Sequence, residues 1–283
     1  MILVTGATGT VGGHLLAQLD LAGTPVRALV RTPEKADVLK GYDAEVAVGD
    51  LARPETLRAA LAGVDRVFLL SPPSPDQPAL EKSLIDAAAA SGRPHVVKLA
   101  SIGFRADGEV IGRNHAEVVD HLKASGLPYT VLAPNFFMQN LLLSASTIQE
   151  QGALFQSAGD GAAAHVDARD VAAVAAHVLT SEGHEGAVYP VTGPAALTFD
   201  EVAATFSRVL GREVRHVDVP VEQARQAMVA GGMDDWLANA MAGLSEIYRE
   251  GSAAEVSDEV EKATGSPARS LEAFVRDHRG AFG

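Results

Sequence analysis

A glycine-rich segment near the start of the chain has the spacing of a phosphate-binding turn. It reads Thr5-Gly6-Ala7-Thr8-Gly9-Thr10-Val11-Gly12 and directly follows a short apolar run. In such a turn Gly6 allows a tight reversal, Gly9 lets the backbone approach a pyrophosphate, and Gly12 lets the following helix pack closely. The alternative is a glycine-rich turn without a ligand. The residues predicted to bind a dinucleotide here are Thr5, Gly6, Thr8, Gly9, Thr10, Val11 and Gly12.

The end of the second predicted strand carries cations where a carboxylate is common. Sites that prefer NAD usually place an acidic residue there, because it accepts from both ribose hydroxyls. This chain has Arg31 instead, followed by Thr32 and then Lys35. A guanidinium can form a two-pronged contact with a 2′-phosphate, to which Thr32 can donate and Lys35 can add charge. We therefore predict that NADP(H) is preferred over NAD(H). The alternative is that Arg31 and Lys35 are solvated cations at a helix start.

Polar residues after the next strands extend the predicted cofactor site. Asp50 follows the third strand and is placed to accept from the adenine amino group, or else it caps the helix before Pro54. Lys98 in the fifth strand could reach the cofactor or a strand-end carbonyl, or else it is a solvated strand terminus. The remaining predicted cofactor contacts follow the fourth, fifth and sixth strands: Leu70, Ser71, Ser101, Pro134, Asn135 and Phe136.

The proton donor of ordinary short-chain reductases is missing from this chain. Those enzymes use a Tyr-x-x-x-Lys helix beside a serine, because a tyrosine of lowered pKa protonates the developing alkoxide. Ser101 stands in the matching serine position. None of the four tyrosines precedes a lysine at the required spacing: Tyr42, Tyr129, Tyr189 and Tyr248. Reduction of simple ketones is therefore disfavoured, whereas quinones, cationic dyes and other electron-poor acceptors need less help from a proton donor.

His115 is the best remaining candidate for a proton donor or a substrate contact. It lies in Arg113-Asn114-His115-Ala116-Glu117, in the region where the tyrosine is expected. An ordinary histidine interconverts between its neutral and charged forms near neutral pH. The alternative is a histidine on the surface of a helix. We predict Ser101 and His115 as the catalytic residues.

The segment after the sixth predicted strand has the composition of an acceptor site. It reads Pro134-Asn135-Phe136-Phe137-Met138-Gln139-Asn140 and is expected to pass over the nicotinamide. Its aromatic and methionine side chains suit a flat apolar molecule, with Asn135 and Asn140 as polar fixing points. Alternatively, Phe136 and Phe137 only pack the lobe against the sheet, or one ring packs there while the other faces the acceptor. The predicted substrate contacts are His115, Phe137, Met138 and Asn140.

No pattern in the chain indicates a metal site or a hydrolase. Asp167 and Asp170 stand at the start of a predicted helix, where carboxylates cap the backbone and join segments. The histidines His165, His177 and His184 show no zinc-ligand spacing with carboxylates. A Gly-x-Ser-x-Gly nucleophile turn is absent, which excludes an α/β-hydrolase.

The elements that must position these residues alternate between strands and helices. This alternation predicts an α/β protein: a Rossmann fold, that is, a doubly wound parallel sheet with helices on both faces. The helices should begin near Thr10, Pro33, Pro54, Pro78 and Arg113. The loops 71–75 and 103–112 should face the active cleft, because ligands bind at the carboxyl ends of such strands. The predicted strands are Ile2–Thr5, Val26–Val30, Glu45–Val48, Arg66–Leu70, His95–Ala100 and Tyr129–Ala133.

After Pro134 the alternation fades, which predicts a smaller α/β lobe. We expect residues 1–133 to bind NADP(H) and residues 134–283 to form mainly a substrate-facing lobe, with some segments returning to the Rossmann sheet. Residues 251–257 have the composition of a mobile polar loop. The elements predicted in this half are helices at 168–179, 199–210, 221–229 and 234–249 and strands at 188–191 and 214–217.

The composition excludes several classes of function. Lys and Arg total 23 against 36 Asp and Glu, and this net charge of −13 repels nucleic acid. There is no cysteine, so disulfides and thiolate chemistry are excluded. The first residues form a strand rather than a signal peptide, and no apolar run is long enough to span a membrane. A cytoplasmic monomer or homodimer with a small-molecule partner is therefore expected.

The motifs together resemble the NmrA-like family of atypical short-chain dehydrogenases/reductases. The resemblance rests on the segments 3–9, 31–35, 49–50, 115–140, 167–171 and 189–194, and so covers nearly the whole chain. It implies a Rossmann domain with a small C-terminal lobe and a preference for NADPH. Members of the family include quinone reductases, triphenylmethane dye reductases, azoreductases and redox-sensing regulators.

Three functions remain open from the sequence. The first is an NADPH-dependent oxidoreductase that passes hydride to a quinone-like, azo or other conjugated acceptor. The second is a non-catalytic NADP(H) sensor that acts through protein partners, because the tyrosine is missing. The third is an isomerase or epimerase with a tightly held cofactor, for which no acid/base pair is found.

Overall fold

The computed structural model describes residues 1–283, which fold into two compact units. Unit 1 comprises Met1–Ala133 and Val171–Tyr189, and unit 2 comprises Pro134–Asp170 and Pro190–Gly283. The chain therefore leaves unit 1 after Ala133, returns to it once, and ends in unit 2. What each part of the chain binds is not decided by this division, so the assignment of a cofactor domain and a substrate lobe stays a prediction.

Unit 1 is built around a sheet in which seven strands follow the order β3-β2-β1-β4-β5-β6-β9. The registers Ile2 to Val26 and Ile2 to Arg66 are those of parallel strands on both sides of β1. The predicted Rossmann sheet is therefore confirmed. Its strands are β1 (Ile2–Val4), β2 (Val26–Val30), β3 (Ala44–Val48), β4 (Arg66–Leu69), β5 (His95–Leu99), β6 (Tyr129–Pro134) and β9 (Val188–Val191).

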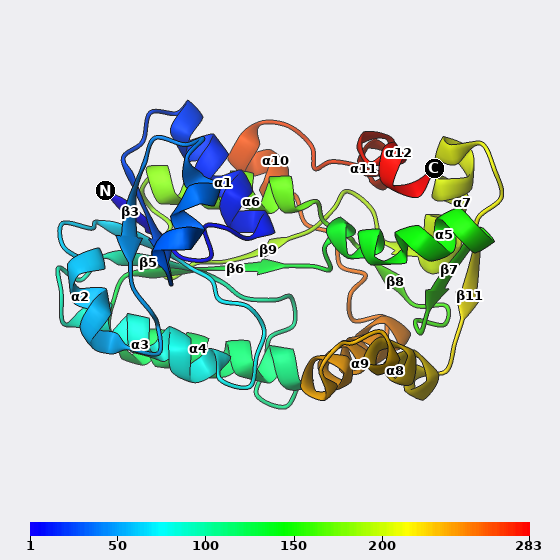
Figure 1. Cartoon of the computed structure of the whole chain (residues 1–283), viewed down its shortest axis with the longest axis horizontal. Helices are drawn as coiled ribbons and strands as arrows, with labels where there is room; N and C mark the ends of the chain where they lie inside the picture. The colour runs from blue at the N-terminus through cyan, green and yellow to red at the C-terminus, as the bar shows by residue number, and fades with distance from the viewer. The chain divides into compact units, whose positions relative to one another are not determined.

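Helices cover both faces of this sheet (Figure 1). On one face lie α1 (Thr10–Leu21) and α6 (Ala168–Thr180), and on the other lie α2 (Leu57–Ala60), α3 (Gln77–Ala89) and α4 (Val110–Ala124). The central strands are buried on both faces, so they form continuous apolar runs rather than alternating ones. The core beneath α3 and α4 includes Leu3, Val67, Leu69, Ile85, Val96, Val118 and Leu122.

One predicted helix start in unit 1 differs from the structure, and two others agree but begin 3₁₀ helices. The helix expected near Arg113 begins at Val110, because the Glu109 carboxylate caps it by accepting from the N–H groups of Ile111 and Gly112. The helix expected near Pro33 is the 3₁₀ helix η1 (Pro33–Leu39). The helix expected near Pro54 is a short 3₁₀ turn, η2 (Pro54–Thr56), followed by the single turn of α2.

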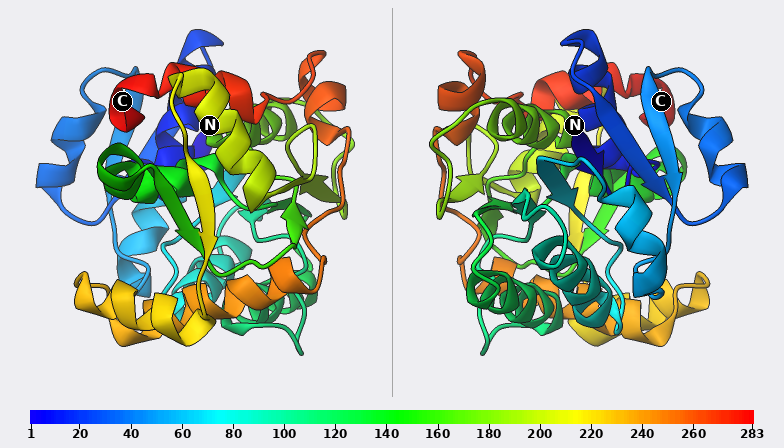
Figure 2. Two further views of the ribbon diagram at one scale, coloured as in Figure 1. Left: turned by 90° about the vertical axis from the view of Figure 1, so that its right-hand side faces the viewer. Right: turned by 90° about the vertical axis from the view of Figure 1, so that its left-hand side faces the viewer.

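Unit 2 combines two small sheets with short helices. The strands β7 (Ala153–Gln156) and β11 (Arg215–Asp218) pair in parallel and lie side by side in the left view of Figure 2. The strands β8 (Ala162–Ala163) and β10 (Leu197–Thr198) pair antiparallel. The helices are η3 (Met138–Ser144), α5 (Ala145–Gln151), α7 (Phe199–Leu210), α8 (Val221–Ala230), α9 (Asp235–Arg249), α10 (Glu259–Thr264), α11 (Leu271–Asp277) and α12 (Arg279–Phe282).

The longer helices of unit 2 (α7, α8 and α9) and the strand β11 match the predicted elements. The other strands and the short helices of unit 2 were not predicted. The helix α7 starts at the predicted residue because Thr198 and Glu201 form a reciprocal capping box. Residues 251–257 contain no regular element, but Ala253 is fully buried, and its carbonyl accepts from Ala164 and from Asn135. This segment is therefore anchored in unit 2 rather than being a free polar loop.

Candidate functional site

The glycine turn leaves the start of α1 open. Gly9 caps the helix without a side-chain hydrogen bond, and the first turn carries no acidic residue. Thr8, Gly9 and Thr10 are exposed around it. Unpaired backbone N–H groups and the positive end of the helix dipole attract anions. The turn can therefore receive phosphate groups.

The shape of this turn depends on glycine at two positions. Gly6 has a φ of +62°, a conformation that other residues rarely adopt. A Cβ atom on Gly12 would lie 2.1 Å from the carbonyl oxygen of Gly6, closer than any two such atoms can approach. Here α1 crosses the turn at backbone contact distance, as predicted from the sequence.

Thr5 ties the turn to the neighbouring strand. Its N–H donates to the Phe68 carbonyl, and its hydroxyl lies 2.8 Å from both the N–H and the carbonyl of Leu70. The polar groups of Thr5 are thus used within the sheet. A direct contact from Thr5 to a ligand stays a prediction, and the geometry favours a structural role.

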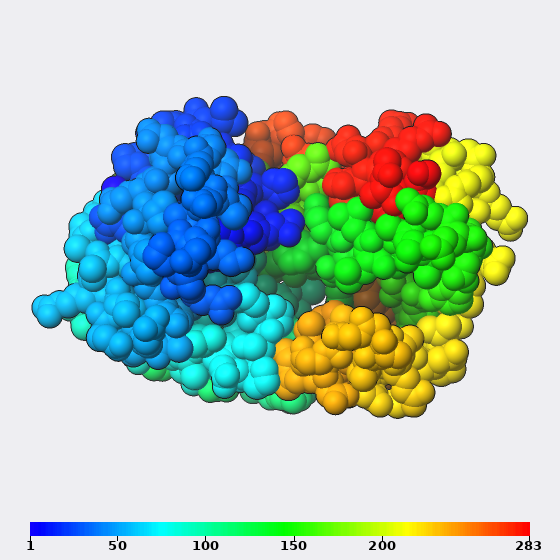
Figure 3. All heavy atoms as spheres, viewed as in Figure 1, coloured from blue at the N-terminus to red at the C-terminus, as the bar shows by residue number.

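Arg31, Thr32 and Lys35 are exposed in the segment that follows β2. This segment belongs to the N-terminal part of the chain, which is blue in Figure 3. The side chains of Arg31 and Lys35 form no hydrogen bond or ion pair within the protein, so both cations are available to an anion. A hydrogen bond from Thr32 lowers the pKa of Glu34 below its ordinary value. The Thr32 hydroxyl is therefore shared with a carboxylate, which weakens its predicted role as a phosphate donor.

Asp50 has the geometry of a turn cap. Its Oδ1 accepts from the N–H of Ala52, and its Oδ2 lies 3.5 Å from Arg53. Asp50 therefore closes a local turn rather than capping the helix at Pro54, which has no side-chain cap, and the contact with adenine stays a prediction.

Lys98 and Glu81 form an ion pair inside unit 1. Both side chains are fully buried, and Nζ lies 2.7 Å from Oε2. Oε1 of Glu81 accepts from the N–H of Ser71 at 3.0 Å and from its hydroxyl at 2.9 Å. Nζ of Lys98 also donates to the carbonyl of Leu99, the last residue of β5. The interpretation of Lys98 as a solvated strand terminus is therefore wrong, and that of a contact with a strand-end carbonyl is confirmed.

His115 is buried, and the charge of Lys98 in this ion pair acts on it. It is only 6% exposed, so the interpretation as a helix-surface histidine is wrong. Burial and the charge of Lys98 lower its pKa well below 6.5, so the imidazole is neutral at pH 7 and does not titrate near neutrality as the sequence suggested. Its Nδ1 and the Oγ of Ser101 are both buried without a hydrogen-bond partner. Such unpaired groups are uncommon in proteins and mark places where a ligand can bind.

The segment 134–140 contributes packing residues as well as candidate ligand contacts. The Asn135 amide donates to the Ala253 carbonyl and accepts from the N–H of Phe136. The ring of Phe136 stacks on that of Tyr248 with centroids 4.1 Å apart. The packing alternative therefore holds for these two residues. Phe137 makes no ring contact and is partly exposed, and Asn140 is exposed.

Met138 lines a cavity inside unit 2. The cavity has a volume of about 220 Å³. Pro194, Leu197 and Leu271 give it apolar walls, while Thr205 and Ser270 contribute hydroxyl groups. Met138 is therefore the predicted substrate residue that borders a pocket of unit 2.

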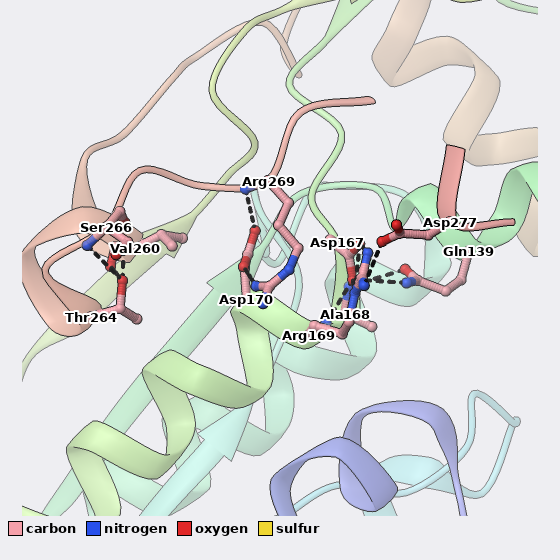
Figure 4. Close-up of polar contacts among 10 residues, drawn as sticks. All are labelled: Gln139, Asp167, Ala168, Arg169, Asp170, Val260, Thr264, Ser266, Arg269 and Asp277. Carbon is pink, nitrogen blue, oxygen red and sulfur yellow. Dashed lines mark hydrogen bonds and ion pairs between the residues drawn. The ribbon is translucent and has the colours of Figure 1, made fainter. Parts of the chain in front are cut away.

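The carboxylates at the start of α6 join segments of unit 2 (Figure 4). Asp167 is fully buried and binds Arg169, which also reaches Asp277 at 2.7 Å. Asp170 accepts from the N–H and the guanidinium of Arg269. Both acids thus have the joining role expected from the sequence. No cluster of three or more metal-ligating side chains occurs in the chain.

Two residues of the buried network were missed in the sequence. Gln77 and Glu81 are one helical turn apart in α3, and both are almost completely buried. The available signal was this pair of polar residues on the apolar side of a helix, together with a lysine inside an apolar strand. The sequence pattern alone does not show that these two irregularities face each other.

The fold and the glycine turn define a Rossmann-fold protein in which no side chain caps the N-terminus of the first helix. The chain belongs to the NmrA-like family, whose model matches residues 1–276. The predicted resemblance is therefore confirmed. No helix of the chain is both long and apolar enough to cross a membrane.

Known proteins resemble the chain over its full length. It is 45% identical to an NAD(P)H azoreductase of Xenophilus azovorans, with 100% of this chain and 99% of the relative covered. It is 41% identical to a (4-alkanoyl-5-oxo-2,5-dihydrofuran-3-yl)methyl phosphate reductase of Streptomyces griseus, with 100% and 99% covered. The crystal structure of the NADPH-dependent quinone oxidoreductase QOR2 of Escherichia coli in complex with NADPH superposes with a TM-score of 0.91 at 29% identity, covering 99% of this chain and 100% of that one.

Two neighbouring glycines test the geometry of the phosphate loop. We expect Gly12→Ala to destabilise the protein by about 2 kcal/mol or more, because its methyl group meets the Gly6 carbonyl. Gly13→Ala is the matched control, since nothing lies within 4 Å of its added Cβ and alanine favours a helix by about 0.5–1 kcal/mol. Urea unfolding of both variants measures the difference. Equal stability of the two variants would contradict the close approach.

Proposed function

We propose that the protein is an NADPH-dependent oxidoreductase that transfers hydride to a quinone-like, azo or other conjugated small molecule. The observation that carries this proposal is the open phosphate turn at α1, followed at the end of β2 by the unpaired cation Arg31. The names of the relatives support it, because one reduces an azo compound, one a conjugated dihydrofuranone phosphate, and one a quinone.

The residues of unit 1 fit an NADPH molecule. The uncapped N–H groups of α1 can hold the pyrophosphate, and the space left by Gly12 lets the helix start lie close to it. Arg31 and Lys35 can hold the 2′-phosphate, whose charge separates NADPH from NADH. This local positive charge stands out in a chain whose net charge is −13.

Bound NADPH supplies a hydride, so the chain's own task is to position the acceptor and to stabilise the charge that develops on it. His115 cannot act as a cationic acid at neutral pH, because burial and Lys98 keep it neutral. A neutral imidazole can still donate one N–H hydrogen bond to an oxygen or nitrogen that becomes negative. Ser101 can donate a second one from its unpaired hydroxyl.

This donor set favours acceptors that tolerate a negative charge. A conjugated acceptor spreads the charge over several atoms and takes up its proton later from water, whereas an isolated ketone forms a localised alkoxide. We assign Phe137, Met138 and Asn140 to the acceptor, with Met138 bordering the cavity in unit 2. The proposal includes a cytoplasmic protein, monomeric or homodimeric, that does not bind nucleic acid.

The proposal is tested by NADPH oxidation with a panel of quinones, azo dyes, triphenylmethane dyes and conjugated lactones. We expect saturable turnover with at least one of them, and little with a simple ketone as the control. If NADPH binds but no acceptor in the panel is reduced, the proposed enzymatic function is wrong and a redox sensor is favoured. Failure to bind NADPH would contradict both the oxidoreductase and the sensor.

The choice of cofactor is tested by reversing one charge. We expect Arg31→Glu to raise the Kd for NADPH by roughly 100-fold and the Kd for NADH by less than about threefold, because only NADPH carries the 2′-phosphate. Lys40→Glu is the matched control, since it makes the same change of charge on an exposed residue of the same segment. Equal weakening of NADPH and NADH by Arg31→Glu would contradict the assignment of Arg31.

A further inference from the structure

A continuous line of polar contacts runs through the interior of unit 1 from the phosphate turn to β5. Thr5 binds Leu70, and the next residue, Ser71, binds Glu81 with both its N–H and its hydroxyl. Glu81 in turn binds Lys98, which donates to the Leu99 carbonyl. The ends of β1, β4 and β5 are thus joined by side chains from one helix and two strands.

The centre of this line is energetically expensive. Lys98 and Glu81 are both fully excluded from solvent, and removing two charges from water costs free energy that their attraction offsets only when the geometry is good. A pair of apolar side chains of similar volume often gives equal or greater stability. Stability alone therefore does not account for a lysine and a glutamate at these positions.

The position of the pair suggests what it does. β5 ends at Leu99, two residues before Ser101, and the charge of Lys98 acts on His115 of α4. Ser101 and His115 are the two buried side chains with unpaired atoms that the proposed function uses as donors. The Lys98 ammonium therefore acts on His115 through its charge, and it holds the strand end before Ser101 through the Leu99 carbonyl.

We propose that Glu81 is a positioning residue for hydride transfer: it holds the Lys98 ammonium at the end of β5, where Lys98 donates to the Leu99 carbonyl two residues before Ser101. This inference rests on the function proposed above, and it adds a residue that touches neither cofactor nor acceptor. Lys98 of β5 is the charged group that acts on His115, and Lys98 is itself paired with Glu81 of α3. The neighbouring ion pair of Lys82 and Glu117 joins the same two helices at the surface.

The test compares single and double replacements of the pair. Glu81→Gln and Lys98→Met each leave one buried charge unpaired, and we expect a Tm roughly 10 °C below the wild type. The double variant Glu81→Gln/Lys98→Met keeps the volume without the charges, and its Tm should return to within a few degrees. Glu81→Asp, which retains the charge but shortens its reach, is the second variant if the double one does not fold.

Three readouts separate positioning from stability. In the double variant we expect single-turnover NADPH oxidation to slow by roughly 10–100-fold, because a misplaced donor costs that much. The Kd for NADPH should change by less than about threefold. The NMR titration of His115, assigned with His115→Gln, should move to higher pH, because the positive charge of Lys98 is gone. Lys82→Met, on the exposed pair, should leave all three readouts unchanged.

A double variant that is as stable and as fast as the wild type would overturn the proposal and make the pair purely structural. An unchanged His115 titration would show that Lys98 does not control this histidine, and would contradict the proposed effect of the Lys98 charge on His115. If the wild type itself turns over no acceptor, the proposed function fails. The His115 titration needs no substrate and still decides whether the pair sets its charge.

Discussion

The backbone of α1 passes so close to the carbonyl of Gly6 that no side chain fits between them. This contact fixes where the first helix begins relative to the first strand, and it leaves the helix N-terminus without a cap. Because the strand order places β1 between β2 and β4, the open helix end lies beside the ends of both neighbours. Arg31 follows one of them and Ser71 the other. The candidate cofactor site thus follows from the close contact of α1 with the Gly6 carbonyl and from the position of β1 between β2 and β4.

Burial influences the protonation of Lys98 and His115, which lie in the interior of unit 1. A lysine, a glutamate and a histidine that would be ordinary surface residues in water lie inside unit 1. Burial disfavours the charged forms of Lys98 and His115, while the attraction of Glu81 opposes this for Lys98. The outcome is one ion pair next to one neutral imidazole. Such a site can orient and stabilise an electron-poor acceptor without a strong acid, which agrees with the missing tyrosine.

Much of unit 1 was predictable because burial on both faces leaves a strong pattern. The starts of β2, β4, β5 and β6 agree with the sequence, since their apolar runs are bounded by turns and polar residues. The glycine turn was predictable for a similar reason, because few other residues satisfy its geometry. In unit 2 the capped helix α7 was found, whereas β7, β8, β10 and the short helices were not. These elements are two to seven residues long and are held by tertiary contacts rather than by a repeating pattern.

The site residues show the same limit. Arg31 could be proposed from the sequence because its position after β2 is set by a local pattern, and its role in the site stays a prediction. Glu81 was missed because its role depends on Lys98, a residue from another element. The sequence also left open whether Lys98 and His115 are exposed, and the structure shows both to be buried. Asn135 was assigned to a ligand, but its amide is used by Ala253, a residue 118 positions later. A contact of this range has no local signature.

The account is tested most directly by single-turnover oxidation of NADPH that carries deuterium at the transferred position, in the presence of a conjugated acceptor. Direct hydride transfer predicts slower oxidation with deuterium and one molecule of acceptor reduced for each NADPH consumed. NADPH that binds and stays reduced, or that is oxidised at a rate independent of deuterium and acceptor, would contradict the central claim.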